Sequence, residues 1–216
     1  MFRGFEIILR GKDPQAGLIM TPRICGICGG SHLYKACYAL DTAWKTFVPQ
    51  NATRVRNLGQ ITETLQSVPR YFYAIMGPDL TAAQYANAST YEEAARRFAP
   101  YVGTSYQKGV TMSQLPVEVY AIFGGQWPHS SFMVPGGVMC APTLSDITRS
   151  HAILDHWEHE LGKRLPLVKD IGGAAIFATF IPSFMAFYQY VPKVIVQSVT
   201  DFTKATNFLY LFIACI

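Results

Sequence analysis

Apolar residues recur at helical spacing along most of the chain before residue 160, which predicts a mainly α-helical protein with a few short strands. Helices are expected over residues 33–46, 52–76 and 91–98, and in a segment that runs through His151 and Trp157. Ser89 or Thr90 is expected to cap the third helix and Ser145 the fourth.

Proline and glycine interrupt this helical pattern. Pro69 is expected to kink the second helix because proline has no backbone N–H. Residues 4–9 fit a strand or a short helix, and Lys12-Asp13-Pro14 ends that segment. Residues 124–129 and 134–138 are rich in glycine and proline and are predicted to be loops.

The last quarter of the chain has a different pattern. Residues 171–192 contain no charged side chain, and their length would allow a membrane span. Gly172, Gly173 and Pro182 argue against a regular span. A small membrane protein built on this segment is therefore one of three functional hypotheses for the chain.

The composition limits which binding partners and which cellular location are expected. Half of the 216 residues are apolar and 15% are charged, so some apolar surface is expected to cover a partner. The net charge is +4 without a long basic run, which argues against nucleic-acid binding. Five irregularly spaced cysteines do not indicate a disulfide framework, and the first residues lack the layout of a signal peptide. We therefore expect a cytoplasmic protein, which could also associate with the cytoplasmic face of a membrane.

Cys25 and Cys28 form a Cys-x-x-Cys pair that is followed by His32. This spacing places two thiolates, ligands that favour soft metals, on one turn of backbone. A redox dithiol usually follows a strand in a βαβ unit, which this helical sequence does not predict. A zinc site needs further ligands, for which His156 and His159 are the available pair on one helix. The spacing alone also allows a third interpretation, in which the two cysteines lie in a loop and bind no metal.

The wider sequence around the pair closely resembles nickel–iron hydrogenase large subunits, most of all the uptake-type and cyanobacterial members. The matching segments are Arg23-Ile24-Cys25-Gly26-Ile27-Cys28 with His32, residues 3–6, residues 11–14, residues 63–67, residues 124–129 and residues 135–137. The resemblance covers residues 1–157. It implies the N-terminal, incomplete part of that fold, and a divergent tail over residues 158–216.

The resemblance also implies roles for individual residues. Cys25 corresponds to a terminal nickel ligand, and Cys28 to a thiolate that bridges nickel and an iron carrying cyanide and carbon monoxide. His32 corresponds to a histidine beside the bridging sulfur, where a hydrogen bond tunes the ligand. Arg23 would lie near the centre, and Glu6 corresponds to a magnesium ligand. His129 corresponds to a structural histidine, and no ligand role is implied for Cys37, Cys140 or Cys215.

The implied activity is reversible oxidation of molecular hydrogen, with electrons leaving through an iron–sulfur small subunit. The family completes its centre with a second Cys-x-x-Cys, which this sequence lacks. We therefore expect an incomplete catalytic subunit from an interrupted reading frame, inactive alone. The alternative is a non-catalytic remnant or binding module without a complete metal centre. Membrane association would come through the partner or through the apolar tail.

Overall fold

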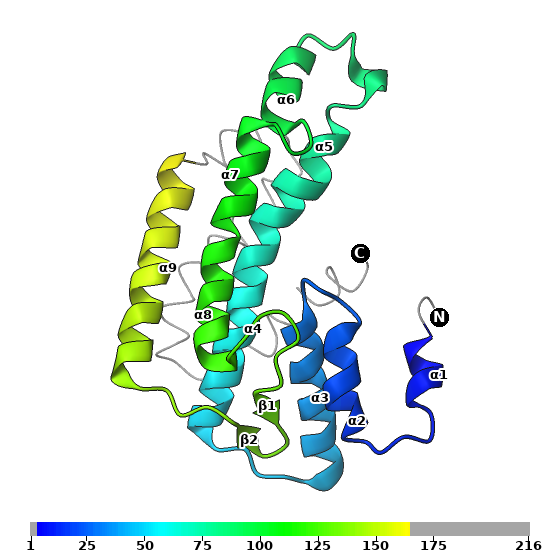
Figure 1. The fold of residues 1–216 in the computed structure, drawn as a ribbon, viewed down its shortest axis with the longest axis vertical. Coiled ribbons are helices and arrows are strands. Elements are labelled where there is room, and N and C mark those ends of the chain that lie inside the picture. The colour runs from blue at the N-terminus through cyan, green and yellow to red at the C-terminus, as the bar shows by residue number, and fades with distance from the viewer. Residues whose placement is uncertain (1–3, 165–216) are drawn as a thin grey trace. The chain divides into compact units, whose positions relative to one another are not determined.

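The computed structural model describes residues 4–164, which form packed helices with one short hairpin near the lower end of α4 and α8 (Figure 1). The elements are α1 Phe5–Leu9, α2 Ala16–Met20, η1 Thr21–Arg23, α3 Gly29–Trp44, α4 Gln50–Arg70, η2 Tyr71–Met76, α5 Gly77–Asp79, η3 Ala83–Tyr85, α6 Tyr91–Phe98, α7 Thr104–Met112, α8 Gln114–Gly124, β1 Met133–Val134, β2 Gly137–Val138 and α9 Leu144–Arg164. The prediction of a mainly α-helical fold with few strands is confirmed.

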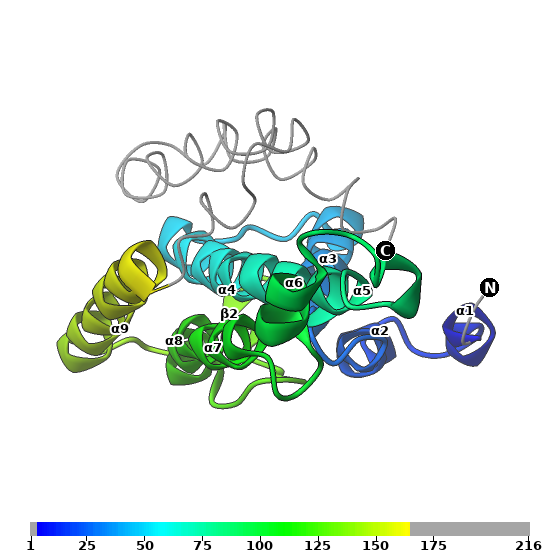
Figure 2. The same ribbon diagram turned by 90° about the horizontal axis from the view of Figure 1, so that it is seen from above.

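Helix α4 lies at the centre of the packing. It contacts α8 most extensively and also contacts α3, α7 and the hairpin strand β2 (Figure 1; Figure 2). Helix α9 packs on the other side of α8, where Trp157 is 1% exposed. The main apolar cluster joins α3, α8 and the hairpin through Leu33, Cys37, Val119, Tyr120, Phe123, Phe132 and Met133. These contacts fix the N-terminus of α3 beside α4.

Helix α4 also buries polar side chains. Arg56, Gln60, Glu63 and Gln66 are each no more than 6% exposed and recur at helical spacing. They form one face of the helix, because residues three or four apart lie above each other. Buried polar groups are costly unless they are hydrogen-bonded. This face must therefore be matched by specific partners on α3 and the hairpin.

The predicted helices are present with shifted ends. Helix α3 begins at Gly29, directly after the cysteine pair, and residues 4–9 contain a short helix rather than a strand. Pro69, where a kink is expected, is the second-last residue of α4, and the π-helix η2 follows directly. Thr90 precedes α6 as its N-cap residue but makes no side-chain capping hydrogen bond.

The prediction that Ser145 caps the last helix is wrong. Helix α9 begins at Leu144, and Thr143 and Asp146 hydrogen-bond reciprocally at its start. The Thr143 backbone and hydroxyl donate to the Asp146 carboxylate, while the Asp146 backbone donates to the Thr143 hydroxyl. This arrangement is a capping box, which satisfies N–H groups that a helix start leaves unpaired.

None of the helices within residues 4–164 is long and apolar enough to cross a membrane. The apolar segment 171–192, on which the membrane-protein hypothesis depended, lies outside the described residues. So does most of the tail predicted to begin at residue 158. The domain boundary at 157/158 therefore stays a prediction.

Candidate metal centre

Cys25 and Cys28 lie in the turn that connects η1 to α3. The backbone N–H groups of Ile27 and Cys28 donate to the Cys25 sulfur at 3.3 and 3.2 Å. The turn therefore carries two cysteine side chains three residues apart, close enough in sequence for both to serve as thiolate ligands of one soft metal.

Cys28 is half-buried, and its surroundings favour the protonated thiol. Burial is the largest cause that raises the pKa of the Cys28 thiol far above its ordinary value, and the hydrogen bond to Cys25 raises it further. The negative charges of Cys25 and Glu63 act in the same direction. A reactive dithiol requires a lowered pKa. A metal ion bound between the sulfurs would reverse this balance, because it binds the deprotonated form.

Glu63 reaches from α4 to the start of α3, although 35 residues separate it in sequence from Cys28. One carboxylate oxygen accepts the Gly30 N–H at 2.7 Å and the Trp127 indole N–H at 3.2 Å. The other accepts the N–H and the hydroxyl of Ser31 at 2.8 and 2.9 Å. Burial raises the pKa of Glu63, and these four donated hydrogen bonds oppose the rise.

Two glutamines on the same face of α4 extend this contact. Gln66 donates to the Ile27 carbonyl at 3.1 Å, and Gln60 donates to the Ser31 hydroxyl at 2.8 Å. One helix face thus holds both the backbone between the two cysteines and the first turn of α3. The sequence analysis assigned no role to these residues, because the contact depends on how α3 packs on α4.

The two glycines after Cys28 permit this close packing. A Cβ on Gly29 would lie 2.7 Å from the Pro22 carbonyl oxygen, and one on Gly30 would lie 2.5 Å from the Tyr120 hydroxyl. Both distances are shorter than real Cβ contacts. The backbone after the cysteine pair can therefore lie against η1 and α8 only because these positions lack side chains.

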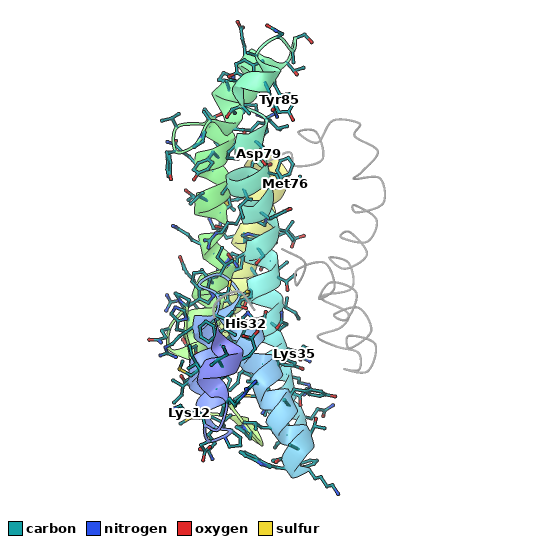
Figure 3. All side chains as sticks on the ribbon, turned by 90° about the vertical axis from the view of Figure 1, so that its right-hand side faces the viewer. Lys12, His32, Lys35, Met76, Asp79 and Tyr85 are labelled. Atoms are coloured by element: carbon teal, nitrogen blue, oxygen red, sulfur yellow. The ribbon has the colours of Figure 1, made fainter. Side chains whose placement is uncertain are left out.

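The other candidate residues are Arg23, His32 and Glu6, and among the described residues none of them hydrogen-bonds to the sulfur of Cys25 or Cys28. Arg23 is exposed and donates to the Ile19 carbonyl. His32 is half-buried one turn into α3, and burial lowers its pKa, which favours the neutral ring (Figure 3). Glu6 is exposed on α1, which packs against α2. The roles predicted for these three residues stay predictions.

His129 and the remaining cysteines fit non-ligand positions. The His129 ring nitrogen Nδ1 lies 2.9 Å from the Pro22 carbonyl oxygen and joins the loop after α8 to η1. Cys37 is fully buried in the apolar cluster, and Cys140 is half-buried beside that cluster. Burial raises the pKa of Cys37 to about 11. Cys215 lies outside the described residues.

The donor set fits half of a four-thiolate centre. Cys25 and Cys28 supply two sulfurs from one turn, while residues 4–164 contain no group of three or more His, Cys, Asp or Glu side chains that could hold a metal ion. Within residues 4–164, His156 and His159 therefore do not join the two cysteines as a second ligand pair for zinc. A nickel–iron centre would find two of its protein ligands here.

Comparison with known proteins gives two relationships. Residues 3–107 match the family model of nickel-dependent hydrogenases. The periplasmic [NiFeSe] hydrogenase large subunit of Desulfomicrobium baculatum is 32% identical over 187 residues, covering 80% of this chain and 36% of that protein. An uptake hydrogenase large subunit of Azotobacter chroococcum is 27% identical over 196 residues. The chain spans about a third of the length of these relatives.

Comparison of the structures shows the same similarity to hydrogenases. A solved structure of the H2-activated D. baculatum [NiFeSe] hydrogenase superposes with a TM-score of 0.66 at 32% identity, covering 80% of this chain and 38% of that one. The described helices thus correspond to part of that larger fold.

The second relationship concerns the C-terminal part. Residues 144–216 match the family model of 2-hydroxycarboxylate transporters. A citrate/malate-proton symporter of Bacillus subtilis is 41% identical over 103 residues, covering 46% of this chain and 21% of that protein. The match to the transporter family model begins within the described residues, at the start of α9.

Proposed function

We propose that this chain supplies the N-terminal part of the catalytic large subunit of a nickel-dependent hydrogenase. Its match to that family over residues 3–107 and its 32% identity with one such large subunit support the proposal. The observation that supports the proposal is the turn between η1 and α3, which carries Cys25 and Cys28 and is held by α4 through Gln66 and Glu63. In this role Cys25 would hold nickel and Cys28 would bridge nickel and iron. The bound centre would supply reversible cleavage of hydrogen into protons and electrons.

The surrounding residues would orient this pair. The N–H groups of Ile27 and Cys28 donate to the Cys25 sulfur and would stabilise its negative charge as a thiolate. His32 is proposed to lie beside the bridging sulfur, and Arg23 to add positive charge near the centre. Cyanide and carbon monoxide on iron, and magnesium at Glu6, belong to the same proposal.

The partner is proposed to be an iron–sulfur small subunit, with molecular hydrogen as substrate. Exposed apolar side chains on α1 and α2, among them Ile7, Ile8 and Ile19, support a covered surface in the complete protein. A cytoplasmic location, with membrane contact through the partner or the tail, stays a prediction. One relative is named as periplasmic.

The chain alone is expected to lack hydrogenase activity, since its sequence supplies one Cys-x-x-Cys pair where the family uses two. The test is the nickel content of the purified 216-residue chain, together with hydrogen-dependent reduction of a dye. We expect less than one nickel per chain and no dye reduction. Stoichiometric nickel with hydrogen-dependent activity would falsify this proposal.

A second candidate function follows from the match of residues 144–216 to the transporter family. We propose that the chain is composite, with a hydrogenase segment followed by part of a 2-hydroxycarboxylate transporter. This origin favours the reading of the polypeptide as a non-catalytic remnant. Sequencing genomic DNA across codons 100–216 on single long reads should show one continuous frame. Two separate genes would show that the joined chain does not exist in the organism.

A further inference from the structure

The start of α3 is capped in an unusual way. Cys28 occupies the N-cap position but makes no side-chain capping hydrogen bond. The side chain at this position ordinarily accepts the N–H groups two and three residues later. Here those groups belong to Gly30 and Ser31, and both donate to Glu63 on α4.

Every partner of the Glu63 carboxylate is a donor. The N–H groups of Gly30, Ser31 and Trp127 can only donate. The Ser31 hydroxyl receives a hydrogen bond from Gln60 and so turns its own proton to Glu63. A carboxylate accepts with both oxygens, whereas an amide would place an NH2 group against two of these donors. The site therefore selects a glutamate, which is 1% exposed.

We propose that Glu63 is a positioning residue for the metal-binding cysteine pair, because it caps α3 in place of the Cys28 side chain and leaves the Cys28 sulfur available as a ligand. Without Glu63, the Cys28 side chain would occupy the position from which an N-cap side chain ordinarily accepts the N–H groups of Gly30 and Ser31. Because Glu63 accepts both N–H groups, they do not compete with a metal ion for the Cys28 sulfur. This inference rests on the proposed role of Cys25 and Cys28 as ligands.

The neighbouring glutamine supports the same function of this helix face. Gln66 lies one turn after Glu63 and holds the Ile27 carbonyl, between the two cysteines. Glu63 and Gln66 thus fix the backbone on both sides of Cys28. The geometry of the sulfur pair is set by α4 as well as by the turn itself.

The test is titration of the full chain with Cd2+, followed by the thiolate-to-cadmium charge-transfer absorbance. Glu63→Gln keeps the size of the side chain and removes half of its acceptors. We expect its Cd2+ affinity to fall about 10-fold or more, as is typical when a residue that orients a ligand is replaced. An affinity equal to that of the unmodified chain would overturn the inference.

Asp41→Asn is the matched control. Asp41 is also a buried carboxylate and lies near the other end of α3. Its hydrogen-bond partners are Arg56 and Gly136, not residues of the cysteine turn. A merely structural role of Glu63 would make both variants less stable and leave the Cd2+ affinity of folded protein the same in both. We expect the affinity to fall in Glu63→Gln alone. Equal losses in both variants would contradict a specific positioning role.

A milder variant keeps the inference testable if Glu63→Gln does not fold. Ser31→Ala removes one of the four donors and is expected to lower the affinity about threefold. An unchanged affinity in Ser31→Ala would then count against the inference. If the unmodified chain itself binds no Cd2+, the proposed function fails first, and the role of Glu63 falls with it. The two failures are therefore distinguishable.

Discussion

Replacing Arg56 by alanine is expected to cause the largest loss of stability of any single substitution at the buried polar face of α4. Arg56 donates to the Asp41 carboxylate at 2.7 Å, to the Gly137 carbonyl at 3.1 Å and to the Val134 carbonyl. The other oxygen of Asp41 accepts the Gly136 N–H at 2.7 Å. This one ion pair therefore joins α3, α4 and the hairpin.

The size of the effect follows from burial. The side chains of Arg56 and Asp41 are 5% and 8% exposed, so Arg56→Ala leaves an uncompensated charge and two carbonyl groups in the interior. Breaking a buried pair from one side costs about 3–5 kcal/mol. The measurement is the free energy of unfolding from urea denaturation of the full chain. A loss below about 1 kcal/mol, the range of exposed pairs, would contradict this account.

Arg96→Ala provides the control for this prediction. Arg96 pairs with Glu93 on α6 at 2.6 Å, and both side chains are more than half exposed. Water and salt screen such a pair, so its removal should leave the urea midpoint nearly unchanged. The comparison separates the effect of burial from the effect of losing an ion pair.

The cysteine turn could be predicted from the sequence because its signal is local. Cys25 and Cys28 are three residues apart, and in the structure both lie in the one turn between η1 and α3. The residues that hold this turn carry no such signal. Glu63 contacts Gly30 and Ser31 from more than 30 positions away, and only the packing of α3 on α4 brings them together. Long-range polar contacts of this kind have no sequence periodicity.

Three helices lacked a readable pattern for a related reason. Helix α2 has five residues, which is too short for a periodic face to emerge. Helix α7 contains Gly109, a poor helix former. A Cβ at Gly109 would lie 2.4 Å from the Cβ of Tyr73, so close packing on η2 accounts for this glycine. Helix α8 contains Pro116 in its first turn, where proline is tolerated.

The capping error at α9 has a similar cause. Ser145 and Thr143 are both hydroxyl residues that suit an N-cap position. Asp146 decides between them, because it lies three residues after Thr143 and completes a reciprocal pair of hydrogen bonds. The same spacing is visible in the sequence and could have placed the helix start correctly.

Serine at either position of the cysteine pair is expected to abolish stoichiometric binding of a soft metal. Two facing thiolates chelate one ion, whereas a single thiolate with a hydroxyl does not, since soft metals select sulfur. The loss should exceed the 100-fold or so that replacement of an outer-shell residue causes. Cys140→Ser is the matched control, because Cys140 is half-buried beside the apolar cluster and lies outside the turn.

The most direct test of the central claim is Cd2+ titration of the full chain and of Cys25→Ser, Cys28→Ser and Cys140→Ser, measured by charge-transfer absorbance. We expect one tightly bound Cd2+ in the unmodified chain and in Cys140→Ser, and none in the other two variants. Unchanged binding in Cys25→Ser or Cys28→Ser would contradict the claim that these two sulfurs form half of a nickel–iron site.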